Sequence, residues 1–360
     1  VRGRVMRARL KPAPGGEEDS LQLVAAEKAH GDSLKVIKRP DGTVTADASE
    51  AELEVTDYFE ALFQGRHEVP VGGQTPVDSG RAFVPDFTHA EDFLANLPKL
   101  RPEDMEGLEL PINVPDLRLA VESAACSRSP GLDGLSYEFY KAVFNQIGLV
   151  MVDGLNSMLE EGQLAPSLCQ GTVRLIPKVK GVPMASQLRP ITLLNTDYKL
   201  LTKVYANRLL GVLPKILQKG QLCSVEGKTI MQGAIALWST SEFLHQRKRK
   251  EFLMNLDFYH AYDRVCLPYV DRVLEAMAFG PVFREMIKTL HRGATASFLL
   301  QKITRAIPIS FSVRQGDPLA MLIYVIQLQP FLLKLDEILP WVEFPDFEEK
   351  VEAYVDDVVV

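Results

Sequence analysis

The feature that most constrains this chain is a pair of adjacent acids, Asp356 and Asp357, near its last residue. The pair follows an alternating apolar and polar run, VEAYV at residues 351–355, and three valines come after it. This alternation predicts a β-hairpin whose tight turn carries the acids. Adjacent carboxylates repel each other, so a clustered pair needs a cation beside it. The alternative is an acidic hairpin tip that faces solvent.

The composition is that of a soluble globular protein. The chain has 360 residues, of which 46% are hydrophobic and 24% are charged, and this length suits two or three structural units. No apolar run approaches the ~20 residues of a membrane span. The chain begins with Val1 and has no apolar signal segment, which indicates the start of a fragment. The cysteines are far apart and form no Cys-x-x-Cys, so we expect reduced thiols, and a location in the nucleus or cytoplasm.

Charge is distributed unevenly along the chain. The formal net charge is −7, yet residues 165–250 carry 14 Lys and Arg against 3 Asp and Glu. Residues 1–120 are acidic, with 14 basic against 22 acidic residues. A basic block inside an acidic chain predicts contact with a nucleic-acid backbone. A solvated helical surface is the alternative.

Hydrophobic periodicity predicts mixed helices and strands. Helices are expected near residues 49–63, 115–125, 195–213, 229–245, 267–278, 281–290 and 318–335. Strands are expected near residues 172–176, 252–257, 295–300 and 307–313. In the helix at 195–213, Lys199, Lys203 and Arg208 are predicted on the polar side. Residues 66–88 are rich in Pro and Gly and are predicted to form a linker. The predicted helices and strands mix irregularly, with no repeat of 20–50 residues.

A third acid, Asp257, is predicted at the end of a strand, on its more polar face. Together with Asp356 and Asp357 it would form a site of hard oxygen ligands suited to Mg²⁺. Two such ions about 4 Å apart activate a 3′-hydroxyl and stabilise a leaving pyrophosphate in phosphoryl transfer. Asp263 is an additional acid nearby.

Two further segments have residue types that suit a nucleotide site. Tyr262 follows Asp257 by five residues, where its ring would press against a sugar and exclude a 2′-hydroxyl, although a core tyrosine fits equally well. In RQGDPL, at 314–319, Gly316 would allow close backbone approach to a ligand. Arg314 and Gln315 would then donate hydrogen bonds to it. An ordinary helix start is the alternative.

The segment GKT at residues 227–229 is not a phosphate-binding P-loop. Such a loop requires a glycine five positions before its second glycine, and that position is Leu222. The sequence therefore disfavours nucleotide hydrolysis through a P-loop.

With these motifs in order, the chain resembles the reverse transcriptases of non-LTR (LINE-type) retrotransposons. The resemblance runs from about residue 33 to the end and is most specific over residues 127–360. The matching segments are SPGLDG (129–134), EFY (138–140), LIPK (175–178), RPI (189–191), ANRL (206–209), Asp257 with AYDRV (261–265), RQGDPL (314–319) and YVDD (354–357). Their common order makes them far more specific than any one of them.

The resemblance implies an α+β right-hand polymerase fold, with fingers and an incomplete palm after a mostly helical N-terminal region. The implied units are an acidic N-terminal region at 1–120 and a reverse transcriptase domain at 121–360. Within that domain, fingers span about 121–250 and a palm about 251–360. The chain stops at Val360, so we expect a truncated palm, no thumb, and little processive synthesis by this piece alone.

The resemblance also implies the site residues and partners of an RNA-directed DNA polymerase. Asp257, Asp356 and Asp357 would be catalytic and bind two Mg²⁺ ions, with Mn²⁺ as a substitute. The implied substrate-binding residues are Lys178 and Arg189 near the triphosphate, Tyr262 at the sugar, and Arg314, Gln315 and Gly316. The implied partners are an RNA template, a DNA primer and deoxynucleotides, without a membrane.

The chain departs from the family pattern at three places. His260 stands where the family has Lys, VEGK at 225–228 replaces a VPGR-like segment, and Ala320 and Met321 replace Ser-Pro. These changes leave open two alternatives to an active enzyme. One is a catalytically inactive nucleic-acid-binding remnant, and the other is a maturase-like relative that acts on RNA structure.

Overall fold

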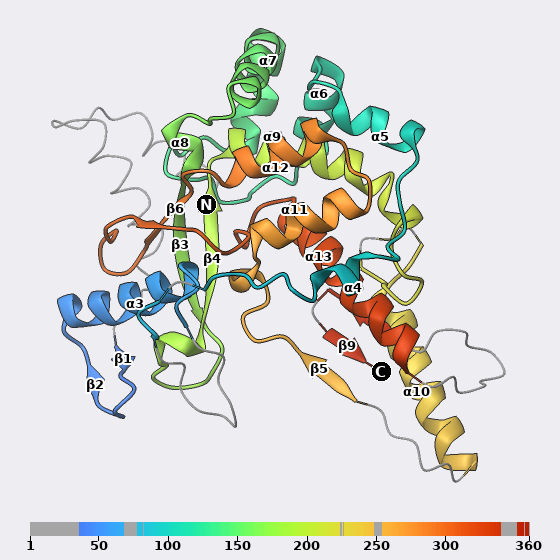
Figure 1. The fold of residues 1–360 in the computed structure, drawn as a ribbon. Coiled ribbons are helices and arrows are strands. Elements are labelled where there is room, and N and C mark those ends of the chain that lie inside the picture. The colour runs from blue at the N-terminus through green and yellow to red at the C-terminus, as the bar shows by residue number, and fades with distance from the viewer. Residues whose placement is uncertain are drawn as a thin grey trace, which may run out of the picture.

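A computed structural model describes residues 36–67, 78–81, 83–223, 225, 227–247, 254–339, 351–355 and 357–359. Over these ranges the chain mixes helices with small sheets, as predicted, and most of the helices gather around α9 and α13 (Figure 1). The finer prediction of a right hand with fingers and palm stays a prediction. No helix in the described ranges is long and apolar enough to cross a bilayer.

The described helices include the seven expected from periodicity, and α4, α5, α7 and α8 in addition. They are α3 (Ala48–Phe63), α4 (Ala90–Leu94), α5 (Pro102–Glu109), α6 (Val114–Glu122), α7 (Tyr137–Glu160), α8 (Pro166–Cys169), α9 (Thr196–Leu210), α10 (Ile230–Arg247), α11 (Leu267–Ala276), α12 (Pro281–His291) and α13 (Ala320–Ile338). Three short 3₁₀ turns are η1 (Ala185–Gln187), η2 (Leu213–Lys215) and η3 (Tyr262–Arg264). The helices expected from periodicity are confirmed, with ends displaced by a few residues.

The described strands form two small sheets and a separate ribbon. The strands are β1 (Ile37–Lys38), β2 (Val44–Thr45), β3 (Gln170–Pro177), β4 (Leu188–Leu194), β5 (Asn255–Asp257), β6 (Thr295–Phe298), β7 (Ile307–Pro308), β8 (Glu352–Tyr354) and β9 (Asp357–Val359). One sheet has the order β4-β3-β6-β7, the other has the order β5-β9-β8, and β1 pairs with β2. In the first sheet, β3 is antiparallel to β4 and parallel to β6.

Helix α3 covers one face of the four-stranded sheet. Asp47 begins the helix by accepting hydrogen bonds from the N–H groups of Ser49 and Glu50. Its apolar stripe is buried, and Phe59 packs its ring 5.0 Å from that of Phe298 in β6. This contact joins the N-terminal region to a strand almost 240 residues later in the chain.

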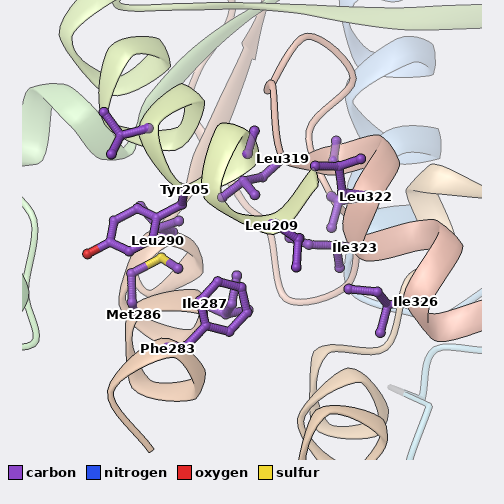
Figure 2. Packing of buried hydrophobic residues seen from close by; sticks show 14 of the residues in the cluster. Tyr205, Leu209, Phe283, Met286, Ile287, Leu290, Leu319, Leu322, Ile323 and Ile326 are labelled. Atoms are coloured by element: carbon purple, nitrogen blue, oxygen red, sulfur yellow. The ribbon is translucent and has the colours of Figure 1, made fainter. Parts of the chain in front are cut away.

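The largest core lies around α9, α12 and α13. Figure 2 shows Tyr205 and Leu209 of α9 facing Phe283 of α12 and residues from the start of α13. Leu108 and Leu117, from α5 and α6, belong to the same buried cluster. Residues on both sides of position 120 thus share one core, and the predicted unit boundary there stays a prediction.

The polar face predicted for the helix at 195–213 is wrong for Lys199 and Arg208, whereas Lys203 is half-exposed. Lys199 is buried, and its Nζ donates a hydrogen bond to the carbonyl oxygen of Ser129 at 3.0 Å. Arg208 pairs with Asp116 of α6 at 2.6 Å. The reason is that α9 is packed on several sides, so these basic residues meet protein partners and not solvent.

Part of the chain named in the predictions lies outside the described residues. This holds for 1–35 of the predicted N-terminal region and for 68–77 and position 82 of the predicted linker. It also holds for 224, 226 and 248–250 of the basic block and for 252–253 of the predicted strand at 252–257. Within the linker, Phe83 packs against Phe311 with ring centroids 5.9 Å apart.

Candidate active site

Two of the three predicted catalytic acids lie opposite each other in the small sheet. β5 and β9 are antiparallel, and Asp257 is directly opposite Asp357. Residues in such a pair point to the same face, with Cβ atoms about 4.5–5.5 Å apart. Both side chains are exposed. This is the same-face arrangement that a shared metal site requires.

The predicted terminal hairpin is confirmed, and Asp357 is the first residue of its second strand and does not lie in the turn. β8 and β9 are antiparallel, and Tyr354 is directly opposite Asp357. The turn residue Val355 has φ of 60°, in the left-handed region. For a β-branched residue this backbone angle is an outlier, and such strain persists where the surrounding structure holds it. The side chain of Val355 is buried, which fixes the turn immediately before the acids.

The facing carboxylates fit a divalent cation. Carboxylate oxygens are the ligands that Mg²⁺ prefers, and two exposed acids on one sheet face offer such ligands. Within the ranges that the structure describes, no group of three or more His, Cys, Asp or Glu side chains is placed to hold a metal ion. The third predicted ligand, Asp356, lies outside those ranges.

Tyr262 stands on η3, just beyond the strand that carries Asp257. Its ring stacks on Tyr324 of α13, with centroids 5.3 Å apart and an interplanar angle of 26°. Its carbonyl oxygen accepts a hydrogen bond from the N–H of Val313 at 3.0 Å. The ring is only partly buried, so it is both a packing residue and available at the surface. Its role as a sugar gate stays a prediction.

The RQGDPL loop is bonded to β4. The N–H of Thr192 donates to the carbonyl oxygen of Gln315 at 2.7 Å. Gly316 has φ of 122°, and a Cβ added there would lie 2.4 Å from the carbonyl oxygen of Thr192. Gly316 thus lies close to the backbone of β4, and its predicted close approach to a ligand stays a prediction. Asp317 accepts a hydrogen bond from the N–H of Leu319 at the start of α13.

Arg314, predicted to bind substrate, lies inside the fold. It is 2% exposed, and its guanidinium lies 4.2 Å from the ring centroid of Tyr198. Nη1 donates to the carbonyl oxygen of Cys169 at 3.0 Å, while Nε and Nη2 have no hydrogen-bond partner among the described residues. The Tyr198 hydroxyl in turn donates to Asp317 at 2.9 Å. A direct substrate contact by Arg314 would require it to leave this interior position.

Lys178 and Arg189 lie at the same end of the β3–β4 hairpin. Arg189 is directly opposite Ile176 in the ladder, and the N–H of Lys178 donates to the carbonyl oxygen of Gln187 at 2.8 Å. Both side chains are exposed. Ile176 is 47% exposed between them, which leaves this end of the hairpin open to a ligand. The predicted pair is thus adjacent in space and accessible.

The SPGLDG segment packs against the start of α9. A Cβ on Gly131 would lie 2.1 Å from Oδ1 of Asn195, so only glycine fits there. The N–H of Leu135 donates to Asp133 at 3.0 Å, and burial raises the pKa of Asp133 to about 6. The SPGLDG segment is therefore packed closely against Asn195 at the start of α9.

Sequence reasoning missed a buried polar cluster behind the loop. Nδ1 of His260 lies 2.9 Å from Oδ2 of Asp263, and Nε2 of Gln315 donates to Oδ1 of Asp263 at 3.1 Å. The sequence drew attention to Asp263 as a nearby acid and to His260 as a departure from the family. An imidazole three residues before an acid was the available signal of their pairing. The contact of His260 with Tyr58 has no local signal, because 202 residues separate them.

The structure therefore places two acids on one sheet face and bonds the RQGDPL loop to the hairpin that carries the basic pair. Residues 176–360, just over half of the chain, match the family described as reverse transcriptase (RNA-dependent DNA polymerase), and the chain belongs to that family. Members of this family generally use divalent metal ions for nucleotide transfer.

Among curated proteins, the chain is 28% identical over 365 residues to the transposon TX1 uncharacterized 149 kDa protein of Xenopus laevis. That alignment covers 100% of this chain and 27% of the relative, so the chain spans about a quarter of the relative's length. The recognition of a reverse transcriptase of the non-LTR (LINE-type) class is confirmed by the family match together with this transposon relative. The roles of individual site residues stay predictions.

Proposed function

We propose that this chain supplies the nucleotide-transferring part of an RNA-directed DNA polymerase from a LINE-type retroelement. The observation that carries the proposal is the pairing of Asp257 with Asp357 on one sheet face, in a chain of the reverse transcriptase family. The substrates are a deoxynucleotide and a primer 3′-hydroxyl on an RNA template. In this proposal the residues near 121–250 form fingers and those near 251–360 a palm.

The acids are the proposed metal ligands. Asp257, Asp356 and Asp357 would hold two Mg²⁺ ions, which lower the pKa of the attacking hydroxyl and stabilise the leaving pyrophosphate when bound. The role of the protein is to hold these carboxylates in position. The ladder between β5 and β9 and the strained turn at Val355 support that role.

The remaining predicted residues take positions around the nucleotide. Lys178 and Arg189 attract the triphosphate as exposed cations at one end of the β3–β4 hairpin. Tyr262, braced by Tyr324, offers a flat wall to the sugar. Gln315 contacts the nucleotide or template. Arg314 acts in this proposal by holding the loop from inside.

Primer extension tests the proposal. On a primed RNA template with Mg²⁺, Asp257→Asn and Asp357→Asn should each lower incorporation of a single nucleotide by at least about a hundred-fold, because metal positioning dominates this transfer. The matched control is Asp153→Asn, which changes an exposed acid on α7 and should leave the rate unchanged.

Metal affinity gives a second readout in the same proteins. Binding of Mn²⁺, followed by its electron paramagnetic resonance signal, should weaken in the Asp257 and Asp357 variants and remain in the Asp153 variant. Equal Mn²⁺ affinity in all four proteins would overturn the metal site. Nucleic-acid binding without any synthesis that depends on these acids would instead favour the inactive remnant.

A further inference from the structure

A chain of hydrogen bonds runs behind the candidate site from α3 to the RQGDPL loop. Gln315 donates to Asp263, and Asp263 faces His260. Nε2 of His260 lies 3.2 Å from the Tyr58 hydroxyl, which lies 3.1 Å from the hydroxyl of Tyr259. We call these five residues the relay.

The middle of the relay is shielded from water. The side chains of His260 and Asp263 are 1% and 3% exposed. Burial raises the pKa of the Tyr58 hydroxyl well above its ordinary range, so the hydroxyl stays neutral. Hydrogen bonds between buried polar groups are stronger than in water, and a missing partner is correspondingly costly. The relay is therefore a rigid link.

The backbone at His260 supports the same conclusion. This residue has φ of 50°, a left-handed conformation that few residues other than glycine adopt. Strain of this kind persists where surrounding contacts hold it. The bonds of the ring to Tyr58 and Asp263 are such contacts. The strained residue lies between Asp257 and Tyr262, within the segment that carries the first catalytic acid.

The partners determine the direction of the hydrogen bonds. Both oxygens of the Asp263 carboxylate accept, one from the amide of Gln315 and the other from Nδ1 of His260. Since Nδ1 faces Asp263, the other ring nitrogen, Nε2, shares the remaining hydrogen bond with the Tyr58 hydroxyl. Because the NH₂ group of Gln315 is bound to Asp263, its Oε1 is the end of the amide that remains for another partner.

We propose that Tyr58, His260 and Asp263 are positioning residues that fix the amide of Gln315, so that Oε1 is presented to the substrate as a hydrogen-bond acceptor. The partner would be a hydroxyl or N–H group of the nucleotide or template. The inference rests on the proposed function for the identity of the substrate. It also assigns a role at the site to α3, which lies before the matched family region at residues 176–360.

The first test is structural and does not depend on synthesis. In ¹⁵N NMR spectra of the intact chain, the His260 ring should be the tautomer protonated at Nδ1, and the side-chain amide of Gln315 should exchange slowly with water. Tyr58→Phe removes one oxygen while the ring keeps its packing against Phe59 and His67. This variant should shift the Nε2 resonance of His260 and speed exchange at Gln315. Unchanged spectra would overturn the relay whether or not the chain is an active polymerase.

The second test separates positioning from general stability. Loss of one hydrogen bond is worth about 1 kcal/mol, so Tyr58→Phe should raise the KM for deoxynucleotide about five-fold with a smaller change in kcat. In a Gln315→Ala background the same substitution should have no further effect on KM. The control, Tyr269→Phe, removes a hydroxyl from a partly buried tyrosine outside the relay and should leave KM unchanged.

The outcomes distinguish the two proposals. If Asp257→Asn leaves synthesis unaffected, the proposed function fails, and the NMR result still decides the relay. If Gln315→Ala raises KM but Tyr58→Phe does not, the polymerase assignment stands and the relay is refuted. Equal effects of Tyr58→Phe with and without Gln315 would also refute it, because the hydroxyl would then act by another route.

Discussion

Gly316 leaves no space for a side chain. Its φ of 122° is unfavourable for other residues, and an added Cβ would meet a backbone oxygen of β4, which cannot move aside as a side chain does. Gly316→Ala should therefore lower the free energy of unfolding by at least about 1–3 kcal/mol and displace the loop. Urea unfolding measures the first effect.

Gly107→Ala is the matched control for that substitution. Gly107 lies in α5 without a left-handed backbone angle, and a Cβ there would meet nothing within 4 Å. Alanine in a helix interior is more favourable than glycine by roughly 0.5–1 kcal/mol, so this variant should be as stable as the parent or more so. Equal stability of the two variants would show that the loop accommodates a side chain by shifting away from β4.

For individual residues, the predictions from the sequence succeeded where the signal was local. The alternation around Asp257 and around the terminal acids predicted their strands, and the structure pairs these strands directly. The interior position of Arg314 was not predictable, because its partners Tyr198 and Cys169 come from distant segments. An arginine also has the same local pattern whether it faces a ligand or a buried tyrosine.

Among the elements, the β3–β4 hairpin presents the predicted basic pair at one exposed end. Each lysine or arginine that neutralises a phosphate contributes about one unit to the slope of log K against log salt concentration. Lys178→Ala and Arg189→Ala should therefore each weaken binding to a primed RNA template and reduce that slope by about one. Fluorescence anisotropy at several salt concentrations gives the slope.

Lys302→Ala controls for the loss of a positive charge alone. Lys302 is exposed and pairs with Glu52 of α3 at 3.2 Å, and it is not part of the β3–β4 hairpin. Its removal should leave the slope unchanged. A reduction equal to that of the hairpin variants would mean that binding reflects overall charge and not a contact at the hairpin.

The packing of α9 explains why hydrophobic periodicity alone predicted the wrong surroundings for its basic residues. The pattern of basic residues was read as a solvated face, whereas α6 and the SPGLDG segment cover that face and supply Asp116 and the Ser129 carbonyl as partners. Helix existence follows from local spacing, but the number of neighbours that a helix acquires depends on the whole chain.

For the whole molecule, the shared core predicts that α6 unfolds together with the later helices. Leu117 is fully buried in the cluster that includes α12 and α13. Leu117→Ala should cost about 2–5 kcal/mol. Because the core is continuous, amide hydrogen exchange should speed up in α12 as well as in α6.

Leu119→Ala provides the control on the same helix. Leu119 is 56% exposed, so its truncation should change stability by no more than about 0.5 kcal/mol. If Leu117→Ala speeds exchange in α6 alone, the region before residue 120 is an independent unit and the predicted boundary gains support. Faster exchange in both α6 and α12 would show that the region before residue 120 folds together with the rest of the chain.

The bond between Thr192 and Gln315 has an evolutionary consequence. The N–H of Thr192 holds the RQGDPL loop, and the carbonyl oxygen of Thr192 excludes a side chain at Gly316. The β3–β4 hairpin and the loop therefore keep a fixed position relative to each other. A change in the path of β4 moves the loop with it, so neither segment can drift alone without losing this fit. Substitutions in the two segments should therefore be inherited as matched sets, and grafting one of them from a relative should succeed only when the other is transferred with it.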